Sequence, residues 1–159
     1  MAYRSLSLSL AVLAFLLVFC AVHTPSMAQG DPTSTYAAVS AAIKAGNLDE
    51  MVKYMSKSSQ ADIAKDRAKP EFSEEKIMKL LQFMAPVSYK VEKQTIKGDK
   101  AVLELSGKSR SMFKPDTLDD AYGRVLMLKE DGQWKLDREN WNNTKLDKWE
   151  AKDLAPFNI

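Results

Sequence analysis

Cysteine and histidine, the residues that most often supply nucleophiles, general bases and metal ligands, each occur once in the 159 residues, as Cys20 and His23. Both lie in the N-terminal segment, in which Arg4 precedes an apolar run from Leu6 to Val22. Small residues stand three and one positions before a cut after Ala28. This order is typical of a secretory signal peptide, so we expect export to the bacterial periplasm or medium and cleavage at Ala28.

Two other fates of this segment are less favoured. The apolar run lies near the lower end of the roughly 17 to 25 residues that a membrane-spanning helix needs, and a cleavage site follows it. A lipid anchor on Cys20 would require a small residue before it, where Phe19 stands. We expect no membrane anchor after cleavage.

Removal of 28 of the 159 residues leaves 131, which is enough for one domain with a core. The mature chain then has no disulfide, no thiol nucleophile, no imidazole base and no Cys/His metal site, so we expect neither a metal nor a cofactor. Without Arg4, 22 Lys+Arg and 21 Asp+Glu remain, a net charge of +1 that gives no basis for nucleic-acid binding. The segment 106–109 lacks the upstream glycine of a phosphate loop, and the glycosylation sequon at 142–144 is incidental in a bacterial protein.

The segment from Ala121 to Trp141 predicts a β-hairpin, because two apolar-rich runs flank the turn-forming pair Asp131-Gly132. Counting outward from a two-residue loop places residue pairs on two faces. One face carries Lys129 opposite Trp134, Met127 opposite Leu136 and Val125 opposite Arg138. The other carries Leu128 opposite Lys135, Leu126 opposite Asp137, Arg124 opposite Glu139 and Tyr122 opposite Trp141. Both faces hold apolar surface, so we expect the hairpin at the centre of a sheet.

The chain before this hairpin changes from helical to strand periodicity. Helices are predicted from Asp31-Pro32 to Gly46, from Asn47 to about Met55, and from Ser73 to Ala85-Pro86, each with a capping residue at its start. The last should bury Ile77, Leu80, Leu81 and Met84. Residues 56–69 predict a loop with a helical turn at 60–67.

A second hairpin is predicted over 87–105, with Lys93 opposite Glu104. The fold class is therefore α+β, with N-terminal helices packed on a curved antiparallel sheet. We divide the chain into a signal peptide at 1–28, this domain at 29–143 and a charged C-terminal tail at 144–159.

Taken together, "AGNLDEMVKYMS", "KGDKAVLEL" and "VLMLKEDGQWKLD" resemble the nuclear-transport-factor-2-like (cystatin-like) superfamily, above all its small secreted bacterial members of unknown function. The resemblance covers roughly 32–141. It implies a cone-shaped sheet around the helices, often with an apolar pocket and often a dimer through the outer sheet face. Pocket candidates are Tyr89, Phe113, Met127 and Trp134, although Trp134 beside Lys129 is also typical of a core anchor.

Enzymes of that superfamily use Asp, Tyr and sometimes His, which here leaves Asp137, Tyr89 and Tyr122. Asp137 alternates with apolar residues and is better interpreted as a solvated strand carboxylate. Three functions stay open: a non-catalytic binding or interaction module, which is favoured; a carboxylate- or Tyr-dependent enzyme resembling isomerases and cyclases and acting on a small apolar ligand; and an envelope accessory protein without a pocket. A buried acid within reach of a Tyr would favour the enzyme.

The outer face of the main hairpin needs a cover, because only one face of the sheet can pack on the helices. Its apolar residues, the interface candidates, are Tyr122, Leu126, Leu128 and Trp141. Either the tail folds back with Leu146 and Trp149 on this face, or a second copy packs there; the narrow apolar stripe of the tail favours the dimer slightly. Possible partners are thus a small apolar ligand, a protein, or a second copy of the chain.

Overall fold

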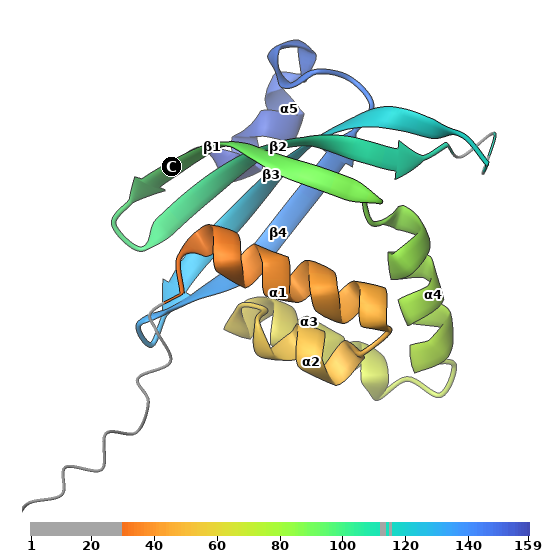
Figure 1. The fold of residues 1–159 in the computed structure, drawn as a ribbon. Coiled ribbons are helices and arrows are strands. Elements are labelled where there is room, and N and C mark those ends of the chain that lie inside the picture. The colour runs from red at the N-terminus through yellow and green to blue at the C-terminus, as the bar shows by residue number, and fades with distance from the viewer. Residues whose placement is uncertain (1–29, 112–113, 115) are drawn as a thin grey trace, which may run out of the picture.

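The computed structural model describes residues 30–111, 114 and 116–159. The signal segment up to Ala28 and the pocket candidate Phe113 lie outside these residues. Four helices come first: α1 (Pro32–Ala45), α2 (Leu48–Lys53), α3 (Lys57–Arg67) and α4 (Glu74–Met84). Four strands follow in one antiparallel sheet of order β1-β2-β3-β4: β1 (Ser88–Lys97), β2 (Lys100–Arg110), β3 (Leu118–Glu130) and β4 (Gln133–Asn142). The expected α+β class, with helices against one face of a curved sheet, is confirmed (Figure 1).

Capping side chains begin the helices where the sequence predicts. Asp31 Oδ1 accepts a hydrogen bond of 3.0 Å from Ser34 N at the start of α1, and Asn47 Oδ1 accepts one of 2.9 Å from Glu50 N at the start of α2. Gly46 ends α1 with φ +70°, a left-handed conformation that suits glycine at this position. None of the described helices is long and apolar enough to cross a membrane.

The helix α3 is longer than the predicted helical turn. It spans 11 residues and buries none of them, so apolar periodicity gave little signal for it. Its start is held instead by Ser56, which is fully buried and whose Oγ accepts from Ser59 N at 3.2 Å. Backbone bonds on either side, Leu136 N to Tyr54 O and Ser56 N to Leu136 O, both 2.7 Å, attach this connection to β4. Tertiary contacts therefore decide this element.

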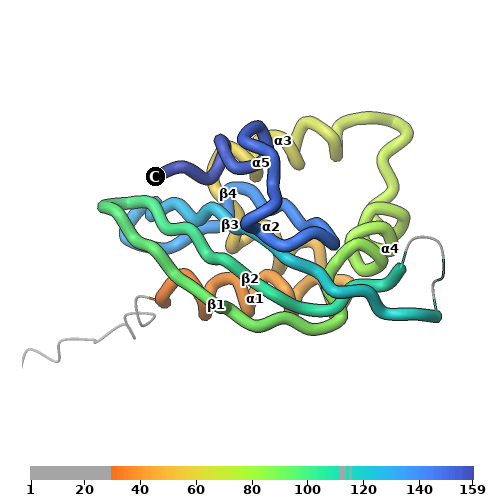
Figure 2. Tube along the Cα trace, turned by 90° about the horizontal axis from the view of Figure 1, so that it is seen from above, coloured from red at the N-terminus to blue at the C-terminus, as the bar shows by residue number. Residues whose placement is uncertain are grey.

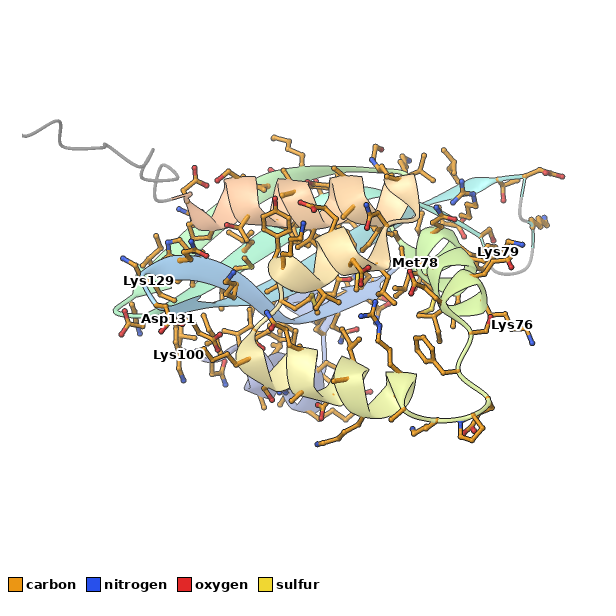
Figure 3. The ribbon with its side chains drawn as sticks, turned by 90° about the horizontal axis from the view of Figure 1, so that it is seen from below. Lys76, Met78, Lys79, Lys100, Lys129 and Asp131 are labelled. Atoms are coloured by element: carbon orange, nitrogen blue, oxygen red, sulfur yellow. The ribbon has the colours of Figure 1, made fainter. Side chains whose placement is uncertain are left out.

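The helix α4 begins at its predicted cap, Ser73, but is rotated about its axis relative to the prediction, so that Met78, Leu81 and Ala85 face the core. Met78, at 4% exposure, is its one buried residue, and it points toward the body of the molecule, away from Lys76 and Lys79 (Figure 3). Of the four residues expected inside, Leu81 is half-buried, whereas Ile77, Leu80 and Met84 are exposed at 38%, 53% and 64%. The predicted buried stripe is wrong for Ile77, Leu80 and Met84, because α4 stands at one end of the sheet (Figure 1) and packs on it mainly through Met78 and Leu81.

The main hairpin has the predicted turn and the predicted first pairs. Lys129 pairs with Trp134 and Met127 with Leu136. A β-bulge between Leu126 and Met127 then shifts the register, so that Leu126 pairs with Arg138, Val125 with Glu139 and Gly123 with Trp141. The expected pairs beyond Leu136 are wrong for this reason.

The bulge moves the β4 residues that follow it, including Glu139 and Trp141, to the face of the sheet opposite the predicted one. Trp141, expected on the outer face, packs against the helix-facing core, and its ring lies over Gly123, where an added Cβ would come within 2.7 Å of it. Arg124 no longer faces Glu139 and instead bonds to Glu104 on β2, with Nη2 2.6 Å from Oε1. In the first hairpin the predicted pairing of Lys93 with Glu104 is confirmed.

The main core lies between the helices and the sheet. Strands β2 and β3 contribute Leu103, Leu105, Val125 and Met127, none with any exposed surface. Helix α1 contributes Tyr36, Val39 and Ile43, all exposed by 6% or less. Their spacing along α1 is the helical spacing that the sequence shows.

The outer face of the sheet carries a smaller cluster that the C-terminal tail completes. The tail forms η1 (Leu146–Lys148), α5 (Ala151–Leu154) and η2 (Ala155–Phe157), and crosses the sheet on the side opposite α1 (Figures 1 and 2). Phe157, at 3% exposure, packs with Val102 and Leu126, and Leu128 and Ile159 flank them. Lys97 Nζ donates to Ile159 O at 2.7 Å.

The C-terminal tail folds back on the outer face, as one of the two alternatives expected, but Phe157 rather than Leu146 or Trp149 makes the central contact. Trp149 is buried, but its indole donates to Thr144 O at 2.8 Å, and Phe157 is the residue that covers Leu126. Of the interface candidates, Tyr122 and Leu128 are half-buried on the outer face, Leu126 lies under the tail and Trp141 is on the helix side. A dimer through the outer face stays a prediction.

Candidate functional site

An open hollow of about 400 Å³ lies where the C-terminal ends of α1 and α4 meet the beginning of β1 and the end of β2. The hollow arises because both helices end there. Gly46 ends α1, and Pro86 prevents α4 from continuing beyond Ala85. The chain then pairs with β2 through a 2.7 Å bond from Val87 N to Lys108 O. The hollow is lined by Ile43, Lys44, Gln82, Ala85, Pro86, Val87 and Arg110.

Three polar side chains of this hollow are held in place by main-chain carbonyl groups. Gln82 Nε2 donates to Lys44 O at 3.2 Å, and Arg110 Nη1 donates to Gln82 O at 3.2 Å. Lys44 Nζ lies 3.5 Å from Val87 O, at the limit of a hydrogen bond. All three groups are hydrogen-bond donors at the mouth of an otherwise apolar surface.

A second hollow of about 410 Å³ adjoins the first on the other side of Gln82. It is lined by Gly46, Glu74, Glu75, Met78, Lys79 and Gln82. Its charges are mutually compensated, since Lys79 Nζ bonds to Glu75 Oε1 at 2.6 Å and Glu74 Oε2 lies 3.5 Å from Arg67 Nη2. Both carboxylates of this second hollow are therefore already paired with cations, unlike the basic groups of the first hollow.

A carboxylate within reach of a tyrosine lies beneath the sheet, at a position that the sequence did not indicate. Tyr36 Oη donates to Glu139 Oε2 at 2.9 Å, and the rings of Tyr36 and Tyr89 meet edge to face, with centroids 5.1 Å apart. Trp141 Nε1 is buried nearby without a well-formed hydrogen bond. We call these four residues, Tyr36, Tyr89, Glu139 and Trp141, the Glu139 cluster.

The surroundings of the Glu139 cluster shift the pKa values of its ionisable side chains. The Glu139 residue keeps surface open to solvent, but protein crowds its carboxyl group, and desolvation raises its pKa although Tyr36 and Trp141 oppose the shift as donors. Desolvation, followed by the charge of Glu139, raises the pKa of Tyr36, and desolvation raises that of Tyr89. The cluster thus has a carboxyl group that is easier to protonate than an ordinary glutamate.

Asp137, the acid considered in the sequence analysis, is held by hydrogen bonds to the beginning of α3. Its Oδ1 accepts from Ser56 Oγ at 2.8 Å, and its main-chain oxygen accepts from Ser59 Oγ at 3.0 Å. Its side chain is 14% exposed, so the expected solvated carboxylate is wrong. Asp137 therefore attaches the beginning of α3 to β4.

The predicted pocket residues are separated in the structure. Met127 has no exposed surface, and Trp134 is 8% exposed within the same core, where Lys129 Nζ lies 5.9 Å from its ring. Tyr89 is half-buried beside Tyr36, and Phe113 lies outside the described residues. None of the described three lines either hollow, so their assignment to a ligand site stays a prediction.

Sequence reasoning missed Lys44, Arg110 and Glu139. Lys44 and Arg110 lie far apart in the chain, at the ends of a helix and of a strand, and no local pattern joins them. Glu139 reaches the helix side only through the bulge, which nothing in its alternating strand predicts. No group of His, Cys, Asp and Glu within the part of the chain that the structure describes could hold a metal ion.

Comparison with known proteins adds a likeness of fold. No protein-family model and no curated protein matches the chain. Among solved structures, a SEC-C motif containing protein from Rhodopseudomonas palustris is similar with a TM-score of 0.52 and 15% identity, over 69% of this chain and 77% of that one. A nuclear-transport-factor-2-like protein of unknown function from Shewanella oneidensis is similar with a TM-score of 0.42 and 10% identity, over 69% and 93%.

At such identities these likenesses concern the fold alone. The helices-first order and the single antiparallel sheet established above are those that the resemblance to nuclear-transport-factor-2-like proteins implies. The resemblance is confirmed as one of fold.

Proposed function

We propose that the protein is an exported, non-catalytic module that binds a small, partly apolar ligand in the hollow between α1, α4 and the sheet. The observation that carries the proposal is the hollow itself. Its volume of about 400 Å³ is typical of small-molecule sites, which are mostly apolar with a few placed polar groups. Ile43, Ala85, Pro86 and Val87 supply the apolar wall, and Gln82 with the two basic residues supplies the polar groups.

Binding is tested with a small library of aliphatic and aromatic acids, amides and amines, followed by two-dimensional ¹H–¹⁵N spectra of the purified protein. We expect some members to shift the amide signals of Ile43, Val87 and Arg110. Complete absence of shifts at the hollow across the library would overturn the proposal. It would then favour an envelope accessory protein without a pocket.

The export part of the proposal rests on Arg4, the apolar run and the small residues that end at Ala28. Intact-mass measurement of the protein recovered from the periplasm or medium tests it. We expect a mass that lacks residues 1–28. A mass that retains them contradicts export with cleavage at Ala28.

A second candidate function, carboxylate- and Tyr-dependent proton transfer, is favoured by one observation, the 2.9 Å contact between Tyr36 and Glu139 with the raised pKa of the carboxyl group. A carboxyl group whose pKa is raised can serve as the general acid or base that isomerases require. A β,γ-unsaturated ketone is a suitable probe, because its conjugated isomer absorbs in the ultraviolet. Turnover that Glu139→Gln abolishes would support the enzyme, and no turnover above the buffer rate would reject it for this class of substrate.

A further inference from the structure

We propose that the ligand of the hollow carries an anionic group, of which a carboxylate is the simplest form, attached to a small apolar body. This inference rests on the proposed function, because it names the chemical class that the same site selects. The features that carry it are the two cations at the rim of the hollow, Lys44 and Arg110, and the absence of any acid among its lining residues.

No carboxylate of the described residues neutralises the two cations. Within the described ranges of the chain, Lys44 and Arg110 form no ion pair. Other basic residues on the same surfaces do: Lys79 pairs with Glu75 at 2.6 Å, and Lys108, two residues before Arg110, pairs with Asp120 at 2.7 Å. The hollow therefore keeps a net positive charge, whereas the adjoining second hollow contains both signs.

Main-chain carbonyl groups hold the cations without using up their donors. An ammonium group has three donors and a guanidinium group five, and one of each is directed at Val87 O and Gln82 O respectively. The remaining donors are available to a ligand. Since Lys44 comes from the end of α1 and Arg110 from the end of β2, they approach from two sides, as two-sided contact with a carboxylate requires.

The wall beneath them limits the rest of the ligand. Ile43 is 6% exposed and packs within the main core, and the side chains of Pro86 and Ala85 have no hydrogen-bond donors or acceptors. A charged body would lose its hydration against this wall without compensation. The site therefore suits an acid whose body is a short alkyl chain or a single ring.

The experiment compares three probes with the same apolar body and different head groups: 4-phenylbutyrate, 4-phenylbutanamide and 4-phenylbutylamine. Dissociation constants are taken from the amide shifts of Ile43, Val87 and Arg110 at low salt. We expect the carboxylate to bind about tenfold more tightly than the amide, and the amine to bind more weakly than both. Added salt should reduce the difference, because the cations lie near the surface.

Variants connect the preference to the two cations. Lys44→Met and Arg110→Gln should each weaken binding of the carboxylate about threefold to tenfold and leave the amide unchanged. Lys90→Gln, which removes an exposed lysine paired with Glu92 on β1, is the matched control and should change neither. Both target residues are exposed, so unchanged circular dichroism and urea midpoints are expected of the variants.

The outcomes separate this inference from the proposed function. Equal affinity for the carboxylate and the amide, or a preference for the amine, overturns the anionic class while binding at the hollow stands. A carboxylate preference that survives both substitutions also overturns it. Failure of these probes and of the whole library to shift the hollow overturns the proposed function together with this inference.

Discussion

The two faces of the sheet are covered in different ways. The helix-facing side is buried by α1, α2 and α4 in one large cluster, in which Leu103, Leu105, Val125 and Met127 have no exposed surface. The outer side has a cluster of three buried residues, Val102, Leu126 and Phe157, completed by the chain terminus. The difference indicates that folding depends on the helix side, whereas the outer cover is a local attachment that can open without global unfolding.

The largest expected effect is on the helix side. Leu103→Ala removes a fully buried side chain between α1 and the sheet, and should lower the free energy of unfolding by about 3 kcal/mol through lost burial and the cavity that remains. Urea denaturation measures it. A loss below about 1 kcal/mol would show that the two faces of the sheet contribute alike to stability, and would contradict the larger role of the helix-facing side.

The next effect concerns the close approach that the bulge creates. Gly123→Ala places a Cβ 2.7 Å from the Trp141 ring, so the ring must move, and we expect a loss of about 2 kcal/mol. Gly132→Ala is unsuitable as a control, because Gly132 has a positive φ that alanine rarely adopts. The comparison variant is Ala121→Gly, which makes the reverse substitution on the same strand as Gly123. If Trp141→Leu does not relieve the effect of Gly123→Ala, the ring is not its cause.

On the outer side, Phe157→Ala should cost only about 1 to 2 kcal/mol. The terminal segment can detach once its anchor is lost, which limits the cost to the free energy of its attachment. Hydrogen exchange should show faster exchange after residue 145 and unchanged protection of β2 and β3. Faster exchange throughout the sheet would contradict a local attachment.

The same variant tests what else can cover the outer face. Sedimentation equilibrium of the native protein and of Phe157→Ala compares their assembly. A monomer in both cases leaves the outer face to the tail. A dimer that Leu126→Lys dissociates would support the predicted interface between two copies, because the introduced charge would be buried without a partner.

The smallest effect is a pH dependence on the helix side. The folded state raises the pKa of Glu139, so it holds this proton more firmly than the unfolded state does. As the pH rises above the ordinary glutamate value of 4.5, the unfolded state ionises first, and stability falls until the folded pKa is passed. Glu139→Gln should remove this decline, by about 1 kcal/mol or less because the residue remains partly in water.

Glu92 provides the matched control for this pH dependence. Hydrogen bonds from Ser106 and Lys90 lower the pKa of its exposed carboxyl group, so its contribution to stability is present above the ordinary value and is lost as the pH falls. Glu92→Gln should therefore lower stability by a constant amount above the ordinary glutamate pKa, and should alter the pH dependence of stability only below that value. A decline above the ordinary glutamate value that persists in Glu139→Gln would assign the effect to another group.

By itself the sequence determined the local features of the fold. Caps at Asp31, Asn47 and Ser73 mark helix starts because a side-chain oxygen satisfies a backbone donor within the same turn. Alternation and the Asp131-Gly132 turn fix the hairpin and its first pairs, since these depend on neighbours in the chain. The helices-first order then fixes the α+β class.

Only the tertiary structure decided which faces are used. Periodicity identifies the apolar face of α4, but the place of this helix at the end of the sheet leaves Ile77, Leu80 and Met84 exposed. One bulge moves Glu139 and Trp141 to the helix side, and its energy depends on Gly123 and α1, which are distant in sequence. Lys44 and Arg110 meet at one hollow only after α1 and β2 have packed, because long-range packing alone brings the ends of separate elements together.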